Sequence, residues 1–266
     1  MKQVFTIFKH YLYRQCKDPM TVLVFTVLPI TMTFVTLMIN PDDMPETIRM
    51  GLILFFLIVF TFFTASQVAY YLNQDFHEGA LRWRLAAAPV PRKAYFIGLA
   101  MSTYTLSVLS SVIYVGASIL LFNAHYTNFL VLVPVMLLLI FIVQCFSTII
   151  YFISKTRTMG EGIAIGVGMV FMFAAGLMFE LPSSAFTDLL LQYGTPVNIA
   201  FNALFHSNFT VYEILATEGI QFAPRIFGVG LDGSLTQSLI ALSAWAVGSF
   251  IIAVVVSKIS KKEVIQ

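Results

Sequence analysis

Six long apolar stretches without a charged residue constrain this chain more than any other feature. They lie at Met20–Ile39, Met50–Leu72, Ala94–Phe122, Asn128–Ile153, Gly162–Phe179 and Leu235–Ser257. Each is about as long as the ~20 residues that a helix needs to cross the hydrocarbon core of a bilayer. Inside lipid, a helix satisfies every backbone hydrogen bond within its own segment. The pattern therefore predicts six transmembrane helices, numbered here as spans 1 to 6.

The composition agrees with a polytopic membrane protein. Hydrophobic residues make up 59% of the chain and charged residues only 11%, whereas soluble domains carry about a quarter charged residues. The apolar runs also lack the two-residue alternation of transmembrane barrel strands. We therefore expect an all-α fold in which residues 1–266 form one transmembrane domain.

The basic residues are distributed unevenly between the two predicted sides of the membrane. Thirteen of the 15 Lys and Arg residues lie before span 1, between spans 2 and 3, between spans 4 and 5, or in the tail, and only Arg49 and Arg225 lie opposite. The opposite side is acidic, with Asp42, Asp43, Glu46, Asp188, Glu213, Glu218 and Asp232. The positive-inside rule then predicts a multi-pass protein of the cell membrane with both termini in the cytoplasm.

Three shorter segments are expected to be helical without crossing the membrane. Residues 3–17 place apolar and basic side chains at helical spacing, which predicts a helix at the inner interface in contact with membrane lipid; a simple basic anchor is the alternative. Phe186–Leu191 and Val197–Phe205 are apolar but too short to cross. We expect them to form two short outer or half-inserted helices between spans 5 and 6.

Small and polar residues mark one face of span 1 and one face of span 5. Span 1 has a stripe of Thr26, Pro29, Thr33 and Thr36, and span 5 contains Gly162-x-x-x-Gly166. Such residues allow helices to pack closely. The stripe of span 1 has two explanations: it packs against another helix, or it faces a transport pathway or a second subunit. The glycines of span 5 allow close packing either within one subunit or between two subunits.

The sequence lacks the residues that several function classes need. It has no Gly-x-x-x-x-Gly-Lys-Ser/Thr motif, and Gly228–Gly233 matches a dinucleotide pattern without a preceding strand. The only acidic residues near span 5, Glu161 and Glu180, flank it. The four histidines lack metal-ligand spacing, and Cys16 and Cys145 are not expected to form a disulfide. A nucleotide-binding enzyme, an intramembrane protease and an ion-driven pump are therefore disfavoured.

The loop between spans 2 and 3 combines apolar and charged side chains. Residues 73–93 carry Phe76, Leu81, Trp83 and Leu85 among charged neighbours. A cytoplasmic segment of this kind can dock on a partner protein. The alternative is a solvated loop whose aromatic residues rest on lipid headgroups.

The order of these motifs resembles that of ABC-2 type permeases, the membrane subunits of a class of ABC transporters. Arg14–Pro19 is similar to the basic elbow before span 1, and Pro29 matches a recurrent proline in that span. Asp75–Val90 resembles the family segment Glu-x-x-x-Gly-Thr-Leu-x-x-Leu-x-x-x-Pro-Val, with Asp75 in place of Glu and Ala80 in place of Thr. Gly176–Pro182, followed by Gly194–Pro196, resembles the end of span 5 and the two short outer helices of the family.

The resemblance implies that the loop between spans 2 and 3 is a coupling helix that docks on a separate ATPase. The matching positions are Asp75, Glu78, Gly79, Leu81, Arg82, Leu85 and Pro89. ATP and Mg would bind to that partner, and this chain would need no cofactor of its own. A second copy or a paralogous permease would supply the other half of the pathway.

The resemblance further implies an ATP-driven exporter. The absence of charge within the spans favours a hydrophobic or amphipathic cargo such as a drug, an antimicrobial peptide or a lipid. A non-transporting immunity or sensor protein that binds an antimicrobial or a lipid would share this topology and is the alternative. No nucleic-acid partner is expected.

Overall fold

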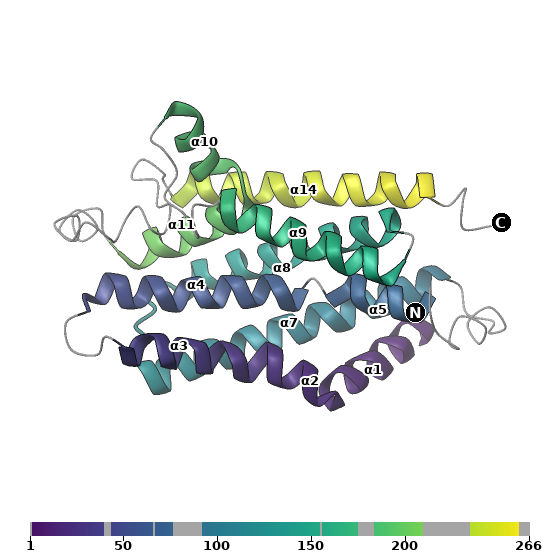
Figure 1. Ribbon diagram of the computed structural model, residues 1–266, viewed down its shortest axis with the longest axis horizontal. Helices are drawn as coiled ribbons and strands as arrows, with labels where there is room; N and C mark the ends of the chain where they lie inside the picture. Colours follow the sequence, from purple (N-terminus) through teal and green to yellow (C-terminus); the bar gives the residue numbers. More distant parts are fainter. Residues whose placement is uncertain are drawn as a thin grey trace.

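The computed structural model describes residues 2–39, 44–65, 67–76, 92–154, 156–174, 184–209 and 235–260. Within these residues every regular element is a helix (Figure 1). The helices are α1 (Lys2–Lys17), α2 (Pro19–Val22), the π-helix η1 (Leu23–Val27), α3 (Leu28–Ile39), α4 (Glu46–Ala65), α5 (Gln67–Phe76), α7 (Arg92–Phe122), α8 (Phe129–Ile153), α9 (Arg157–Ala174), α10 (Ala185–Tyr193), α11 (Pro196–Asn208) and α14 (Leu235–Ile259). The predicted all-α fold is confirmed.

Within the described residues, each predicted span corresponds to one helix or to a run of two or three consecutive helices. Four segments are long and apolar enough to cross a membrane: Glu46–Leu72, Lys93–Phe122, Phe129–Ile153 and Leu235–Ile259. Leu23–Ile39 and Thr158–Phe171 are shorter apolar helices. The structure thus confirms a polytopic helical membrane protein, whereas six complete crossings remain a prediction.

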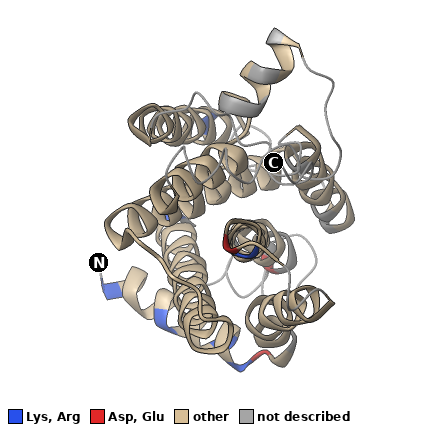
Figure 2. Cartoon of the chain, turned by 90° about the vertical axis from the view of Figure 1, so that its left-hand side faces the viewer, with Lys and Arg blue, Asp and Glu red and all other residues tan. Residues whose placement is uncertain are grey.

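The long helices lie side by side along one direction, which Figure 2 shows nearly end-on. α5 ends, α7 begins and α14 ends at the same end of the bundle, and α1 lies there too (Figure 1). α3 ends and α4 begins at the opposite end (Figure 1). This arrangement brings α1 next to the two helices that flank residues 77–91.

Span 1 contains a π-helical turn whose cause is visible in the sequence. Proline has no backbone N–H, and in an α-helix its ring clashes with the carbonyl four residues earlier, which here belongs to Phe25. The turn Leu23–Val27 is widened, so the N–H of Leu28 donates to the carbonyl of Leu23, five residues back. Pro29 then fits into a continuous helix, and a π-turn of this kind is frequent at functional sites.

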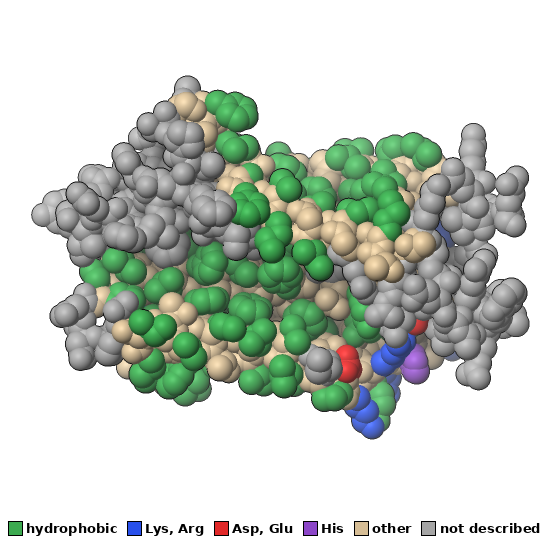
Figure 3. Space-filling model, in the orientation of Figure 1, with side chains coloured by type: hydrophobic (Ala, Val, Ile, Leu, Met, Phe, Trp, Pro, Cys, Tyr) green, Lys and Arg blue, Asp and Glu red, His purple; other side chains and the backbone are tan. Residues whose placement is uncertain are grey.

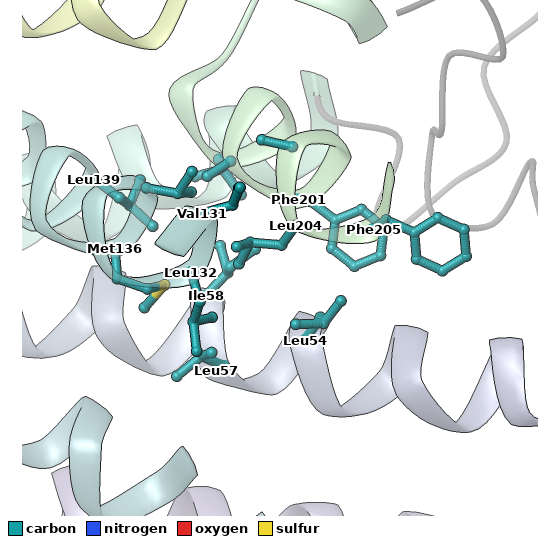
Figure 4. Close-up of a cluster of buried hydrophobic side chains, with 14 of the residues drawn as sticks. Leu54, Leu57, Ile58, Val131, Leu132, Met136, Leu139, Phe201, Leu204 and Phe205 are labelled. Atoms are coloured by element: carbon teal, nitrogen blue, oxygen red, sulfur yellow. The ribbon is translucent and has the colours of Figure 1, made fainter. Parts of the chain in front are cut away.

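The helix α11 forms part of the core of the bundle. Thr195 caps it by accepting from the N–H of Asn198 at 3.2 Å, and Pro196 occupies the first turn, where a missing N–H costs nothing. Every residue from Pro196 to Phe205 is buried. Phe201, Leu204 and Phe205 belong to one buried cluster with side chains of α4 and α8, among them Leu54, Ile58 and Leu132 (Figure 4).

The two predicted short helices are therefore present, but they differ in their surroundings. α10 begins at a capping box between Ser184 and Thr187 and exposes Phe186 and Leu189. α11 contacts α4, α8 and α14, so it is packed among the helices of the bundle, as a half-inserted helix would be. Cys16 is exposed and Cys145 is buried.

Candidate coupling junction between α1, α5 and α7

Asp75 is a buried carboxylate at the end of span 2. It lies in the last turn of α5, at the start of the segment that resembles a coupling helix, and its exposed fraction is only 3%. Tyr71 precedes it by four residues, which places both side chains on one face of α5. A buried carboxylate needs hydrogen bonds or a countercharge to offset its desolvation.

Three side chains from two other helices supply those interactions. The hydroxyls of Tyr11 in α1 and Tyr95 in α7 both donate to Oδ2 of Asp75, the latter at 2.6 Å. Nη1 of Arg14 in α1 forms an ion pair with Oδ1 at 3.2 Å. We call the four residues Tyr11, Arg14, Asp75 and Tyr95 the junction.

The junction depends on the close packing of α1 against α7. A Cβ atom built on Gly98 would lie 2.8 Å from Cγ2 of Ile7 and 3.0 Å from the carbonyl oxygen of Val4. Glycine therefore allows the two helices to approach at this point. The rings of Tyr11 and Tyr95 meet edge to face, with centroids 5.4 Å apart, an arrangement that aromatic quadrupoles favour.

A second set of contacts extends the junction to the start of span 1. The guanidinium of Arg14 lies 5.7 Å from the ring centroid of Tyr71, within cation–π range. The hydroxyls of Tyr71 and Thr21 are 3.2 Å apart, and Thr21 donates to Asp18 at 2.6 Å. The polar contacts consequently connect four helices, α1, α2, α5 and α7.

Burial raises the pKa of Asp75 above its ordinary value, because the charged form loses hydration. The charge of Arg14 and its hydrogen bond oppose this shift, and His10 adds a weaker effect in the same direction as Arg14. The hydrogen bonds and the positive charge of its neighbours thus offset part of the free-energy cost of desolvating the Asp75 carboxylate. Removing a partner would leave that cost uncompensated.

Among the residues predicted to couple to an ATPase, the structure places only Asp75. It lies inside the chain and not on an exposed docking surface. The other six positions, Glu78, Gly79, Leu81, Arg82, Leu85 and Pro89, fall outside the described residues. Among these positions, the structure therefore describes only how Asp75 is attached to the helix bundle.

The threonine and proline stripe of span 1 does not form one open face. Pro29 and Thr33 are buried, and Oγ1 of Thr33 lies 2.7 Å from the hydroxyl of Tyr114 in α7. Pro29 also borders a cleft of about 10 Å³, close to the space that one water needs. Thr26 and Thr36 are half-buried. The middle of the stripe thus packs within the subunit.

The glycines of span 5 have the opposite environment. Gly162 and Gly166 are exposed, and a Cβ atom built on either meets no atom within 4 Å in the described part of the chain. Gly168, by contrast, packs against Phe62. Packing against the described residues of the subunit therefore does not explain Gly162 and Gly166.

The amino-acid sequence matches a known family of membrane proteins. The sequence matches the family model described as ABC-2 type transporter over residues 2–209. The chain belongs to the ABC-2 type transporter family. It is a permease component of an ABC transporter and resides in the membrane. ABC-2 permeases in general associate with an ABC ATPase. No curated protein matches this permease.

Most of the junction was not predicted as a site. Asp75 belongs to the motif that resembles a coupling helix. Residues 3–17, which include Tyr11, were expected only to form an interfacial helix, and Arg14 was expected only to be part of that helix and of the elbow Arg14–Pro19. Tyr95 carried no signal, because a tyrosine near the start of a span is ordinary at a membrane interface. Only the packing of α1 on α7 reveals that the three side chains meet Asp75.

Removing one phenol from the junction should destabilise this permease. Tyr95→Phe and Tyr11→Phe each delete a hydrogen bond to a buried carboxylate, which is worth about 1.5–3 kcal/mol. We expect a lower unfolding midpoint for both variants on heating in mild detergent. Tyr13→Phe is the matched control, because Tyr13 is exposed on the other face of α1. Equal midpoints for all three variants would contradict the assigned role of the junction.

The raised pKa of Asp75 has a consequence for stability as pH changes. A group whose pKa is higher in the folded state than in the unfolded state contributes most to the free energy of unfolding at a pH below its pKa in the unfolded chain, which is about 3.9 for Asp. This stabilising contribution is lost as the pH rises through the pKa of the folded state. Lowering the pH from 7 toward 4 should therefore stabilise the unmodified chain relative to Asp75→Asn. Thermal unfolding of both proteins across this range measures the difference, and a difference independent of pH would exclude the effect.

Proposed function

We propose that this permease forms half of an ATP-driven exporter and that residues 77–91 dock the ATPase. The observation that carries the proposal is the buried attachment of Asp75 to α1 and α7. Asp75 is two residues before the segment, and α7 begins at Arg92, directly after it. A force applied to the segment by a docked ATPase therefore acts first on the helices that the junction joins.

The junction suits the transmission of such a force. Its polar contacts are buried, and separating them would leave an uncompensated carboxylate. α1, α5 and α7 should consequently move together when the segment is displaced. Through Tyr71, Thr21 and Asp18 the movement reaches α2 and the π-helical turn of span 1.

The source of energy follows from what the spans lack. The six predicted stretches contain no Lys, Arg, Asp or Glu, whereas ion-driven carriers keep ionisable groups at membrane depth. Hydrolysis by a partner ATPase supplies the energy, with both termini of the permease on the same, cytoplasmic side. An uncharged pathway favours a hydrophobic or amphipathic cargo.

The second half of the pathway comes from another permease, either a second copy or a paralogue. Gly162 and Gly166 lie on a face of α9 that α9 does not use for packing within the described chain. Small residues spaced by four allow two helices to approach closely in a membrane. We assign this face of α9 to the contact between subunits.

Capture of the ATPase tests the docking segment. Purification of tagged permease from its native cells in mild detergent should recover an ATP-hydrolysing subunit in stoichiometric amount. Glu78→Ala and Leu81→Asp should each reduce its recovery, because one removes a charge and the other places a carboxylate on an apolar docking face. The readout is the ATPase activity and band intensity per permease.

Glu46→Ala is the matched control for this experiment. Glu46 is exposed at the opposite end of the bundle, where it lies 3.9 Å from Arg49. Its substitution removes the same charge without touching residues 77–91. Unchanged recovery in Glu78→Ala and Leu81→Asp, or recovery of permease alone under conditions that preserve another ABC complex, would refute the proposed docking.

The contact between subunits is tested with bulky substitutions at glycine. Gly162→Leu combined with Gly166→Leu should leave the unfolding midpoint of the isolated subunit nearly unchanged but abolish dimers detected by cross-linking in membranes. Gly98→Leu should do the reverse, because its side chain would collide with Ile7 and separate α1 from α7. Persisting dimers in the double variant would place the contact elsewhere.

A further inference from the structure

The helix α1 has an outward face that the described bundle does not cover. Lys2, Phe5, Lys9, Tyr13 and Lys17 are exposed along it, with exposed fractions of 65% for Phe5 and 60% for Tyr13. These five residues follow one side of a single helix. We call them the open face of α1.

All charged residues on the open face are basic. α1 contains four basic residues and no acidic one. Arg14 turns inward to Asp75, so the three lysines carry the outward charge. Figure 3 shows basic side chains gathered at this end of the molecule, with acidic and histidine side chains beside them, below a largely apolar surface. A surface of this charge is complementary to phosphate groups.

Aromatic rings lie between the lysines. Nζ of Lys17 is 4.5 Å from the ring centroid of Tyr13, and an open groove of about 560 Å³ is bordered by Phe5, Lys9 and Tyr13. Alternating aromatic and basic side chains suit a membrane interface, where rings enter the headgroup layer and amines remain at the phosphates. Neither a purely aqueous surface nor the hydrocarbon core satisfies both kinds of side chain.

The place of α1 in the bundle gives the open face access to that layer. α1 lies at the end where α5 stops and α7 starts (Figure 1), beside the limits of the apolar segments Glu46–Leu72 and Lys93–Phe122. These limits mark the boundary between lipid tails and headgroups. The open face is thus at the depth of the headgroups of one leaflet.

We propose that the open face of α1 binds the headgroups of anionic phospholipids and thereby fixes the depth of the junction in the membrane. The opposite face of α1 carries Tyr11 and Arg14, which hold Asp75. An anionic surface attracts each nearby lysine by a factor of about five in affinity. The binding itself is independent of the proposed function, whereas its effect on coupling rests on it.

Fluorescence from Cys16 tests the binding in the full chain. Cys16 is exposed next to Lys17, and Cys145→Ala leaves it as the single cysteine. The chain is labelled at Cys16 with an environment-sensitive dye and placed in nanodiscs of phosphatidylcholine, with or without phosphatidylglycerol. A trace of headgroup-spin-labelled phosphatidylcholine reports by quenching how close α1 lies to the surface.

We expect at least twofold stronger quenching in discs that contain phosphatidylglycerol, and a decline of this difference as salt screens the charges. Lys2→Gln, Lys9→Gln and Lys17→Gln combined should abolish the difference. Lys258→Gln, which removes a lysine from the end of α14, should preserve it.

Equal quenching in the two lipids, or a preference that survives the triple substitution, would overturn the proposal. Quenching that stays weak in both lipids and a dye that becomes shielded only after ATPase addition would assign the open face to the protein partner. The test needs no ATPase for its main result. Failure of lipid binding is therefore distinguishable from failure of ATPase capture.

Discussion

The arrangement of this permease at one membrane boundary depends on the buried carboxylate of Asp75. A carboxylate in this position is stable only while Tyr11, Tyr95 and Arg14 remain in place. Its requirement for partners fixes how α1 lies on α7 and where α5 ends. Elsewhere the helices are held mainly by apolar packing, with separate hydrogen bonds such as those between Thr33 and Tyr114 and between Thr61 and Ser111. Such packing tolerates small sliding movements more readily than a satisfied buried polar network does.

The subunit therefore has two regions that differ in the kind of contact between their helices. Around the junction, directional hydrogen bonds connect α1, α5 and α7. In the core formed by α4, α8, α11 and α14, contacts are mainly between aliphatic and aromatic side chains (Figure 4). The π-helical turn ahead of Pro29 lies where the first region meets span 1. A membrane transporter needs both properties, because movement received at one end has to reorganise helices at the other.

The sequence predicted the helices well because uncharged runs of membrane-spanning length leave few alternatives. It also predicted the two short helices after span 5. It could not predict that α11 is buried, because an apolar helix reads the same whether it meets lipid or protein. Nor could it pair Asp75 with Tyr11, 64 residues away, or separate Pro29 and Thr33, which pack inward, from Gly162 and Gly166, which remain exposed. Such pairings depend on helix rotation, which periodicity alone leaves open.

The burial of α11 has a consequence for the order in which the chain is assembled. α11 contacts α4 and α8, which are synthesised before it, and α14, which is synthesised after it. During synthesis the contacts of α11 with α4 and α8 therefore become possible before its contacts with α14. A chain that stops before residue 235 would leave α11 without the contacts that α14 provides, so loss of α14 would appear as a defect of biogenesis.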